Sequence, residues 1–217
     1  MNGESGKSAR RRAEMVEHQL RRRGIRDERV LAVMADLPRE LFLPADHQHA
    51  SYDDGAQPIG LGQTISQPYI VGLMTDALDV RPSHRVLEIG SGSGYQTAIL
   101  ARLAKWVYGV ERLEELAARA AVTLAALGDA NVTLRVGDGS LGWPEQAPFD
   151  RILCGAGSPD VPPSWAEQLV DGGKIVLPIG PQDRQQLIRI DKASGKLTRT
   201  VLCEVRFVPL IGEQGWT

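Results

Sequence analysis

Three acidic residues, each near the end of a short apolar segment, carry the first chemical signal in the sequence. Glu88 lies in VLEIGSGSGY, Glu111 closes WVYGVE, and Asp138 lies in VTLRVGDG. Each apolar segment has the length and composition of a buried strand. Because the carboxyl ends of parallel strands meet in one crevice, we expect the three carboxylates to lie around one ligand.

A glycine-rich loop follows the first of these acids, with Gly90, Gly92 and Gly94 between a predicted strand and a predicted helix. Glycines let the backbone approach a ligand closely, and the first N–H groups of the next helix are free to bind it. The dinucleotide fingerprint requires glycine where Tyr95 stands, and no lysine follows as in a P-loop. A tight strand-to-helix turn without a ligand is the alternative.

The acids indicate which ligand the loop would hold. Glu88 would repel a pyrophosphate but suits a ligand that carries an ammonium and a sulfonium group. Glu111, 17 residues beyond Gly94, stands where an acid pairs with ribose hydroxyls, and Asp138 could reach an adenine edge. Together they favour S-adenosylmethionine over NAD. The alternatives are structural: Glu111 could cap the helix starting near Arg112, and Asp138 could belong to an Asx-turn.

A second polar segment, GLGQTISQPYIVG, occupies residues 60–72, ahead of the glycine loop. Its glycines, Gly60 and Gly62, permit motion of the chain. Ser66 has a hydroxyl that can orient a reacting group. The alternative is that Ser66 caps the next helix, since Pro68 suits the first turn of a helix.

Strand-like and helix-like segments alternate through the middle of the chain, which predicts parallel βαβ units. The tail, with QQLIRID and KLTRTVLCEVRFVPL, reads as an antiparallel hairpin. We therefore predict an α/β fold: a mostly parallel, Rossmann-like sheet with helices on both faces, an antiparallel edge and added N-terminal helices. The predicted strands are 85–90, 106–111, 132–139 and 149–156; the predicted helices are 10–23, 27–37, 67–81, 95–104, 112–127 and 163–170.

The chain length of 217 residues suits one domain. The expected division is a disordered tail at 1–9 and one domain at 10–217, made of an N-terminal helical segment and substrate loop at 10–80, a cofactor-binding core at 81–183 and C-terminal antiparallel strands at 184–217.

Composition and charge exclude several classes of protein. The net charge is −2, so no overall field favours nucleic acid or membrane. Arginines crowd residues 10–23, and we interpret them as a solvated helix face rather than a nucleic-acid arm, because no aromatic residues lie among them. Neither the two cysteines nor the four histidines show metal-ligand spacing. Because no apolar run is long enough for a membrane span or a signal peptide, we expect a cytoplasmic protein.

Four segments together resemble the bacterial form of one family, the protein-L-isoaspartate O-methyltransferases. They are GQTISQPYIV, VLEIGSGSGYQTAILA, GDGSLGWPEQAPFD and RFVPLIGEQGW. The resemblance runs from about Met15 to the C-terminus. Many methyltransferases share the glycine loop, whereas TISQP is far more specific to this family.

The resemblance implies a class I S-adenosylmethionine-dependent methyltransferase fold. It implies transfer of a methyl group from S-adenosylmethionine to the free α-carboxylate of an L-isoaspartyl residue, leaving S-adenosylhomocysteine, with no metal. In the family the ester collapses to a succinimide, whose hydrolysis returns some normal aspartate, so the activity is protein repair. The expected partners are isoaspartyl peptides and damaged proteins, with no nucleic acid or membrane, and the expected state is a monomer.

The resemblance assigns the catalytic role to Ser66. Combined with the strand-end acids, it gives a cofactor site of Thr64, Ile65, Ser66, Glu88, Gly90, Ser91, Gly92, Gly94, Glu111, Asp138 and Gly139. The expected substrate site is Thr64, Ser66, Val208, Pro209 and Leu210. The chain departs from the family at Cys154 and Gly155, where many members have small or hydroxyl residues, and this could shift the wall near the cofactor.

The predicted chemistry needs no general base, because a carboxylate is already anionic at pH 7. Removing water and aligning the reactants supply the catalysis. Three other functions remain open: a methyltransferase for a small molecule or nucleic acid, a non-catalytic S-adenosylmethionine-binding module, and a dehydrogenase, which Tyr95 and Glu88 disfavour.

Overall fold

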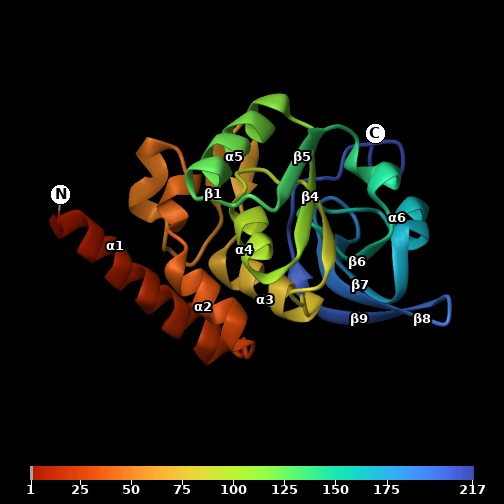
Figure 1. Ribbon diagram of the computed structural model, residues 1–217, viewed down its shortest axis with the longest axis horizontal. Helices are drawn as coiled ribbons and strands as arrows, with labels where there is room; N and C mark the ends of the chain where they lie inside the picture. Colours follow the sequence, from red (N-terminus) through yellow and green to blue (C-terminus); the bar gives the residue numbers. More distant parts are fainter. Residues whose placement is uncertain (1) are drawn as a thin grey trace.

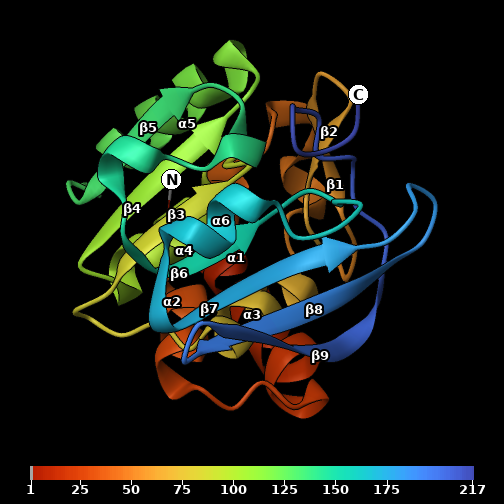
Figure 2. The ribbon, with the colours of Figure 1, turned by 90° about the vertical axis from the view of Figure 1, so that its right-hand side faces the viewer.

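A seven-stranded sheet forms the centre of the computed structural model, which describes the backbone of residues 2–217 and the side chains from residue 6 onward (Figures 1 and 2). The strand order is β5-β4-β3-β6-β7-β8-β9, with the first five strands parallel and the last two antiparallel. The strands are β3 (Arg85–Ile89), β4 (Trp106–Glu111), β5 (Val132–Val136), β6 (Phe149–Cys154), β7 (Leu169–Ile179), β8 (Gln185–Ala193) and β9 (Lys196–Val205). The predicted α/β class and its antiparallel edge are confirmed.

Helices cover the two faces of this sheet unequally. The helices are α1 (Asn2–Met15), α2 (Glu28–Asp36), α3 (Pro68–Leu78), α4 (Tyr95–Leu103), α5 (Glu114–Ala126) and α6 (Pro163–Gln168). One hydrophobic cluster joins α2–α5 to one face, and a second joins α6 and the C-terminal segment to the other. Figure 2 shows α6 in front of the sheet and α3 behind it. Both faces are therefore buried, as parallel strands require.

Strand β3 shows how this layering sorts side chains. Val86 packs in the cluster of α4, whereas Leu87 and Ile89 pack in the cluster of α6. Successive side chains of a strand point to opposite faces. Glu88 therefore lies on the side of α4, where its carboxylate accepts a hydrogen bond from the Thr97 hydroxyl. This alternation decides where Glu88 can act.

The N-terminal segment differs from the prediction at its start. Helix α1 begins at Asn2, so residues 2–9 are helical where the sequence predicted a disordered tail; Met1 lies outside the described residues. Helical turns continue to Arg23 and end at Gly24, whose φ of 99° suits a glycine. Asp27 caps α2 by accepting from the Arg29 N–H, as predicted.

The segment expected to be a loop up to Gln63 contains regular structure. Strands β1 (Gln57–Gly60) and β2 (Gln63–Ile65) pair as an antiparallel hairpin, after two 3₁₀ helices at Arg39–Phe42 and Ala45–Ala50. Both glycines at the hairpin tip have positive φ. The sequence lacks strand-like alternation here because the hairpin is short and covers the sheet edge rather than belonging to the sheet. The third predicted strand is also shorter than expected and ends at Val136.

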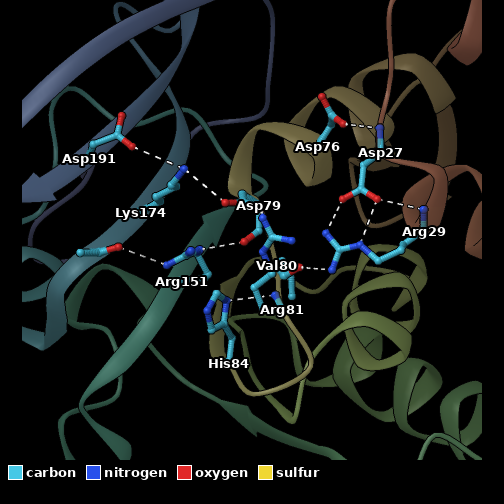
Figure 3. A network of polar contacts seen from close by, with 11 residues as sticks. Asp27, Arg29, Asp76, Asp79, Val80, Arg81, His84, Arg151, Lys174 and Asp191 are labelled. Carbon is cyan, nitrogen blue, oxygen red and sulfur yellow. Dashed lines mark hydrogen bonds and ion pairs between the residues drawn. The ribbon is translucent and has the colours of Figure 1, made fainter.

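A network of charged side chains joins the helices to the amino ends of the strands (Figure 3). We call it the amino-edge network; its members are Asp27, Arg29, Asp76, Asp79, Arg81, Arg151, Lys174 and Asp191. Lys174 lies between two carboxylates, 3.6 Å from Asp79 and 3.8 Å from Asp191. Arg29 donates to Asp27 and to the Val80 carbonyl. The network fastens α2 and the end of α3 to the sheet on the side opposite the glycine loop.

Candidate active site

The glycine loop lines a cavity of about 200 Å³ at the carboxyl edge of the sheet, which we call the cofactor cavity. Gly90 and Gly92 have φ of 77° and 53°, a region that other residues adopt at a cost. The loop has little space around it: a Cβ on Gly92 would lie 3.5 Å from Ile59 of the hairpin, and one on Gly94 would lie 3.1 Å from Ala120. The loop therefore presents backbone, between the hairpin and α5. The hairpin, the loop and the segment from Glu111 to Leu113, just before α5, line the cavity.

Glu111 lines this cavity at the end of β4. Its carboxylate accepts hydrogen bonds from the Gly92 N–H at 2.8 Å and from the Leu113 N–H at 2.9 Å. The second contact holds the backbone just before α5, but the N-cap of α5 is Leu113 and no side chain caps this helix, so the capping alternative for Glu111 is wrong. The first fixes the glycine loop against β4. Because each oxygen has more than one lone pair, both contacts leave the carboxylate able to accept from a ligand hydroxyl.

Both carboxylate oxygens of Asp138 accept hydrogen bonds from other residues of the protein. It caps the short 3₁₀ helix Gly139–Leu141 through the Ser140 N–H, and its other oxygen accepts from the Glu213 N–H at 2.8 Å. These hydrogen bonds lower the pKa of Asp138, against the effect of burial. The Asx-turn interpretation is therefore correct for its geometry. Gly139 lines the cofactor cavity, whereas Asp138 is absent from its lining.

Glu88 lies in a smaller adjoining cavity, on the α4 side of the glycine loop. Its side chain is buried, and burial, reinforced by the nearby Glu111 carboxylate, raises the pKa of Glu88 to about 8. At pH 7 the Glu88 side chain is thus mainly a neutral acid. Ser91 lines the same cavity with a buried hydroxyl that has no hydrogen-bond partner in the described chain. This small cavity thus holds polar groups that a ligand could satisfy.

Ser66 stands where the small cavity meets a third, wider one of about 320 Å³, which we call the acceptor cavity. The N-cap of α3 is Gln67, so the alternative role for Ser66 as helix cap is wrong. Its carbonyl accepts from Arg39, while its hydroxyl makes no hydrogen bond to any described residue. Thr64 lines all three cavities. The hairpin thus places the TISQP turn between them, and the Ser66 hydroxyl is available to a ligand.

The C-terminal segment forms the opposite wall. Val208, Pro209 and Leu210 line the cofactor cavity, and Val208 also lines the acceptor cavity. The Gly157 N–H donates to the Val208 carbonyl, and the Leu210 N–H donates to the Gly157 carbonyl, each at 2.8 Å. Backbone pairing therefore fixes this wall to the loop after β6.

Gly155 lines the site, although the sequence showed it only as a departure from the family pattern. It lines all three cavities, and a Cβ there would lie 3.1 Å from the Gly90 carbonyl oxygen. Cys154 instead is buried in the sheet, with its thiol against the Ala156 carbonyl. Gly155 is thus the member of the pair that borders the ligand. Phe207 and Arg39 were also missed, since nothing in their sequence context separates them from core or surface residues.

The basic N-terminal segment is tied to the protein. Arg11 contacts Asp53, and Arg23 contacts Asp54 and stacks on the Tyr69 ring at 3.7 Å. Asp54 in turn accepts from Gln67 and lines the acceptor cavity. The arginines therefore hold the loop that borders the acceptor cavity, a role beyond the solvated face that the sequence predicted.

Over residues 2–217, no helix combines the length and apolarity needed to cross a membrane. In the same part, no three His, Cys, Asp or Glu side chains gather closely enough to hold a metal ion.

A mostly parallel sheet with a glycine loop after one strand and an acid at the end of the next, closed by an antiparallel edge, matches the fold of class I S-adenosylmethionine-dependent methyltransferases. Residues 10–215 match the family described as protein-L-isoaspartate(D-aspartate) O-methyltransferase. The chain belongs to this family and is an S-adenosylmethionine-dependent methyltransferase.

Relatives in sequence and structure agree with this assignment. The protein-L-isoaspartate O-methyltransferase of Methanoculleus marisnigri is 51% identical, covering 95% of this chain and 94% of its own; that of Dictyoglomus turgidum is 52% identical, covering 91% and 90%. A solved protein-L-isoaspartate O-methyltransferase superposes with a TM-score of 0.82 at 29% identity, over 94% of this chain and 67% of its own. A Plasmodium falciparum structure, described as such an enzyme in complex with S-adenosyl-L-homocysteine, gives a TM-score of 0.79 at 26% identity, covering 92% and 98%.

Proposed function

We propose that the chain methylates the free α-carboxylate of L-isoaspartyl residues in damaged proteins and peptides, the first step of their repair. The observation that carries the proposal is the unbonded Ser66 hydroxyl at the junction of the cavities. The cofactor cavity suits S-adenosylmethionine, because glycine backbone and the Glu111 carboxylate line it. When bound, S-adenosylmethionine supplies an electrophilic methyl group on a sulfonium.

The residues proposed to hold the cofactor fall into two groups. Glu111, Gly90, Gly92 and Gly139 face the cofactor cavity, where Glu111 would pair with ribose hydroxyls. Glu88 and Ser91 face the small cavity on the other side of the loop, together with Ile65. Because the Asp138 carboxylate is already occupied, we assign it the support of Gly139 rather than direct contact with adenine.

Ser66 would orient the acceptor carboxylate by donating a hydrogen bond from its hydroxyl. The carboxylate is anionic at pH 7 and needs no base, so a donor that fixes its direction is sufficient. Val208 borders the acceptor cavity, while Pro209 and Leu210 continue the apolar wall along the cofactor cavity; such a wall would keep water from the reacting groups, which favours a reaction in which opposite charges cancel. The acceptor cavity between the Asp54 loop and Phe207 is open enough for an extended peptide with varied neighbours.

The acceptor is tested with labelled S-adenosylmethionine and two matched peptides, one with aspartate and one with isoaspartate at the same position. We expect base-labile label on the isoaspartyl peptide alone. Label on neither peptide, with cofactor bound, would instead favour a non-catalytic module, and label on a nucleic acid or small molecule would favour the other methyltransferase class.

The role of Ser66 is tested by Ser66→Ala. Losing one hydrogen bond to a charged group costs about 1.5–3 kcal/mol, so we expect the single-turnover methylation rate to fall by roughly 10- to 150-fold while S-adenosylhomocysteine still binds. Ser164→Ala, a partly buried serine of α6 that lines none of these cavities, is the matched control and should keep its rate. Near-normal turnover of Ser66→Ala would remove Ser66 from the mechanism.

We further propose that the enzyme acts as a cytoplasmic monomer made of one domain, without nucleic-acid binding. The engagement of the N-terminal arginines with Asp53 and Asp54 supports the last point, because those cations already have partners. Light scattering after size-exclusion chromatography tests the monomer, and an electrophoretic shift assay with RNA and DNA tests the absence of binding.

A further inference from the structure

Arg39 is the largest charged side chain that the fold buries completely. It lies in the 3₁₀ helix Arg39–Phe42, and its exposed fraction is 0%. Its Nε donates to the Ser51 carbonyl at 2.8 Å, and one Nη donates to the Ser66 carbonyl at 2.7 Å. The guanidinium carbon lies 4.8 Å from the centre of the Tyr95 ring. One side chain thus contacts the end of the 3₁₀ helix Ala45–Ala50, the TISQP turn and the first residue of α4.

The charge of Arg39 has no acidic partner within the described chain. The neighbouring Glu40 instead accepts from the Tyr52 hydroxyl, and the other Arg39 Nη is buried without a hydrogen bond. Burial lowers the pKa of the Arg39 guanidinium, which the Tyr95 hydroxyl group opposes. An unpaired buried cation is costly. A residue that only filled space or hydrogen-bonded backbone carbonyls would not need a charge. The arrangement therefore favours a role that uses the planar guanidinium group of Arg39.

Two of the residues that Arg39 contacts lie at the proposed active site. Ser66 carries the hydroxyl proposed to orient the acceptor, and Tyr95 directly follows Gly94 of the glycine loop. The Ser66 hydroxyl has no bond of its own to a described residue, so its direction depends on how its backbone is held. In the described structure the Ser66 carbonyl is held by Arg39.

We propose that Arg39 is a positioning residue for methyl transfer: its guanidinium holds the Ser66 carbonyl and so fixes the Ser66 hydroxyl relative to the glycine loop. The inference rests on the proposed function of Ser66. Arginine suits this role because its planar group presents several donors in fixed directions, whereas a lysine ammonium is one point on a flexible stem. A misplacement of about 1 Å is enough to lower a rate on the order of 100-fold.

The experiment is a double-mutant cycle between Arg39 and Ser66, read by single-turnover methylation of an isoaspartyl peptide. The Arg39 variants are Arg39→Lys, which keeps the charge, and Arg39→Gln, which removes it and leaves one donor nitrogen in place of three. With Ser66 present, we expect each variant to lower the rate at least about tenfold, Gln more than Lys. In the Ser66→Ala background, we expect a further loss of less than about threefold, because the group that Arg39 positions is gone.

Binding of S-adenosylhomocysteine shows whether each variant is folded, and we expect its affinity to stay within about threefold of the original. The matched control is Arg151→Lys, another mostly buried arginine that donates to backbone carbonyls, here of Asp79 and Asp150 at the amino edge. It should lower stability and leave the single-turnover rate unchanged.

Three results would overturn the proposal. The first is an equal loss of rate from the Arg39 variants with and without Ser66. The second is loss of S-adenosylhomocysteine binding in both Arg39 variants, which would make Arg39 a purely structural residue. The third is a similar loss of rate in the Arg151→Lys control. A normal rate for Ser66→Ala alone is a separate outcome, because it refutes the proposed function of Ser66 before any Arg39 variant is compared.

Discussion

The two edges of the sheet treat charged residues in opposite ways. At the amino edge, the carboxylates of Asp27, Asp79 and Asp191 each meet an arginine or lysine (Figure 3). At the carboxyl edge, Glu88 and Glu111 contact only a hydroxyl and backbone N–H groups of described residues. Both edges are built by the same strands, so the strand framework does not account for the difference.

This contrast distinguishes residues that stabilise the fold from residues that are available to bind a ligand. The charges at the amino edge already have partners of opposite sign. At the carboxyl edge, buried acids without a cation, the Ser91 hydroxyl and the Ser66 hydroxyl all retain hydrogen-bonding capacity. Strained or incompletely satisfied groups gather where proteins do chemistry. The position of Arg39, a buried cation without an acid, extends this pattern to a residue behind the site.

Removing Glu111 should produce the largest effect and would test the carboxyl-edge half of this contrast. Glu111→Ala frees the Gly92 and Leu113 N–H groups and removes the proposed ribose acceptor. We expect S-adenosylhomocysteine affinity to fall on the order of 100-fold, since hydrogen bonds to a carboxylate are each worth about 1.5–3 kcal/mol. Isothermal titration measures it, with exposed Glu114→Ala on the next turn as control. An unchanged affinity would show that Glu111 only stabilises the glycine loop and does not contact the ligand.

A change at the amino edge should instead affect stability and spare activity. Asp27→Ala removes the cap of α2 and the carboxylate that Arg29 contacts. We expect the free energy of unfolding to fall by about 1–2 kcal/mol, as for other lost N-caps, with the single-turnover rate unchanged. Urea denaturation measures it. Glu28→Ala, whose carboxylate is an exposed partner of Arg21, should stay within about 0.5 kcal/mol. A loss of rate in Asp27→Ala would mean that the two edges are coupled.

The same contrast explains how far the sequence could predict this molecule. The sequence predicted β3, β4, β6 and α5 closely. The spacing of apolar residues indicates which side chains are buried, and turn residues mark where each element ends. Gly90, Gly92 and Glu111 were predicted as site residues and line the cofactor cavity, whereas the predicted Gly94 lies against Ala120 and lines none of the three cavities. These features depend on residues near one another in the chain.

Contacts between segments that are distant in the chain could not be predicted from the sequence. Arg39 stands in PRELFLP, where nothing shows that its side chain reaches Ser66, 27 residues away. Asp138 has the right position for adenine, yet the C-terminal turn at Glu213 occupies its carboxylate. The β1–β2 hairpin has too few residues for a period to be visible. In each case tertiary packing, rather than local pattern, decides what a side chain can do.

The pH dependence of stability tests whether the carboxyl edge carries a proton as well as free acceptors. Burial, with Glu111 nearby, raises the pKa of Glu88 to about 8, far above its ordinary value of 4.5. A carboxyl group whose pKa is raised on folding stabilises the folded state less as pH rises. The ligand-free protein should therefore lose stability progressively between pH 5 and about 8, and Glu88→Gln should flatten that part of the profile.

Thermal unfolding across this pH range, compared between the original chain and Glu88→Gln, measures the slope. The groups around Glu88 are the Thr97 and Ser91 hydroxyls, the Glu111 carboxylate and the Cys154 thiol, whose pKa burial raises to about 12. Because that thiol stays protonated below pH 8, the slope that disappears in Glu88→Gln belongs to the Glu88 proton. Identical profiles for the two proteins would mean that Glu88 is ionised at neutral pH. The carboxyl edge would then hold two buried negative charges before any cationic ligand arrives.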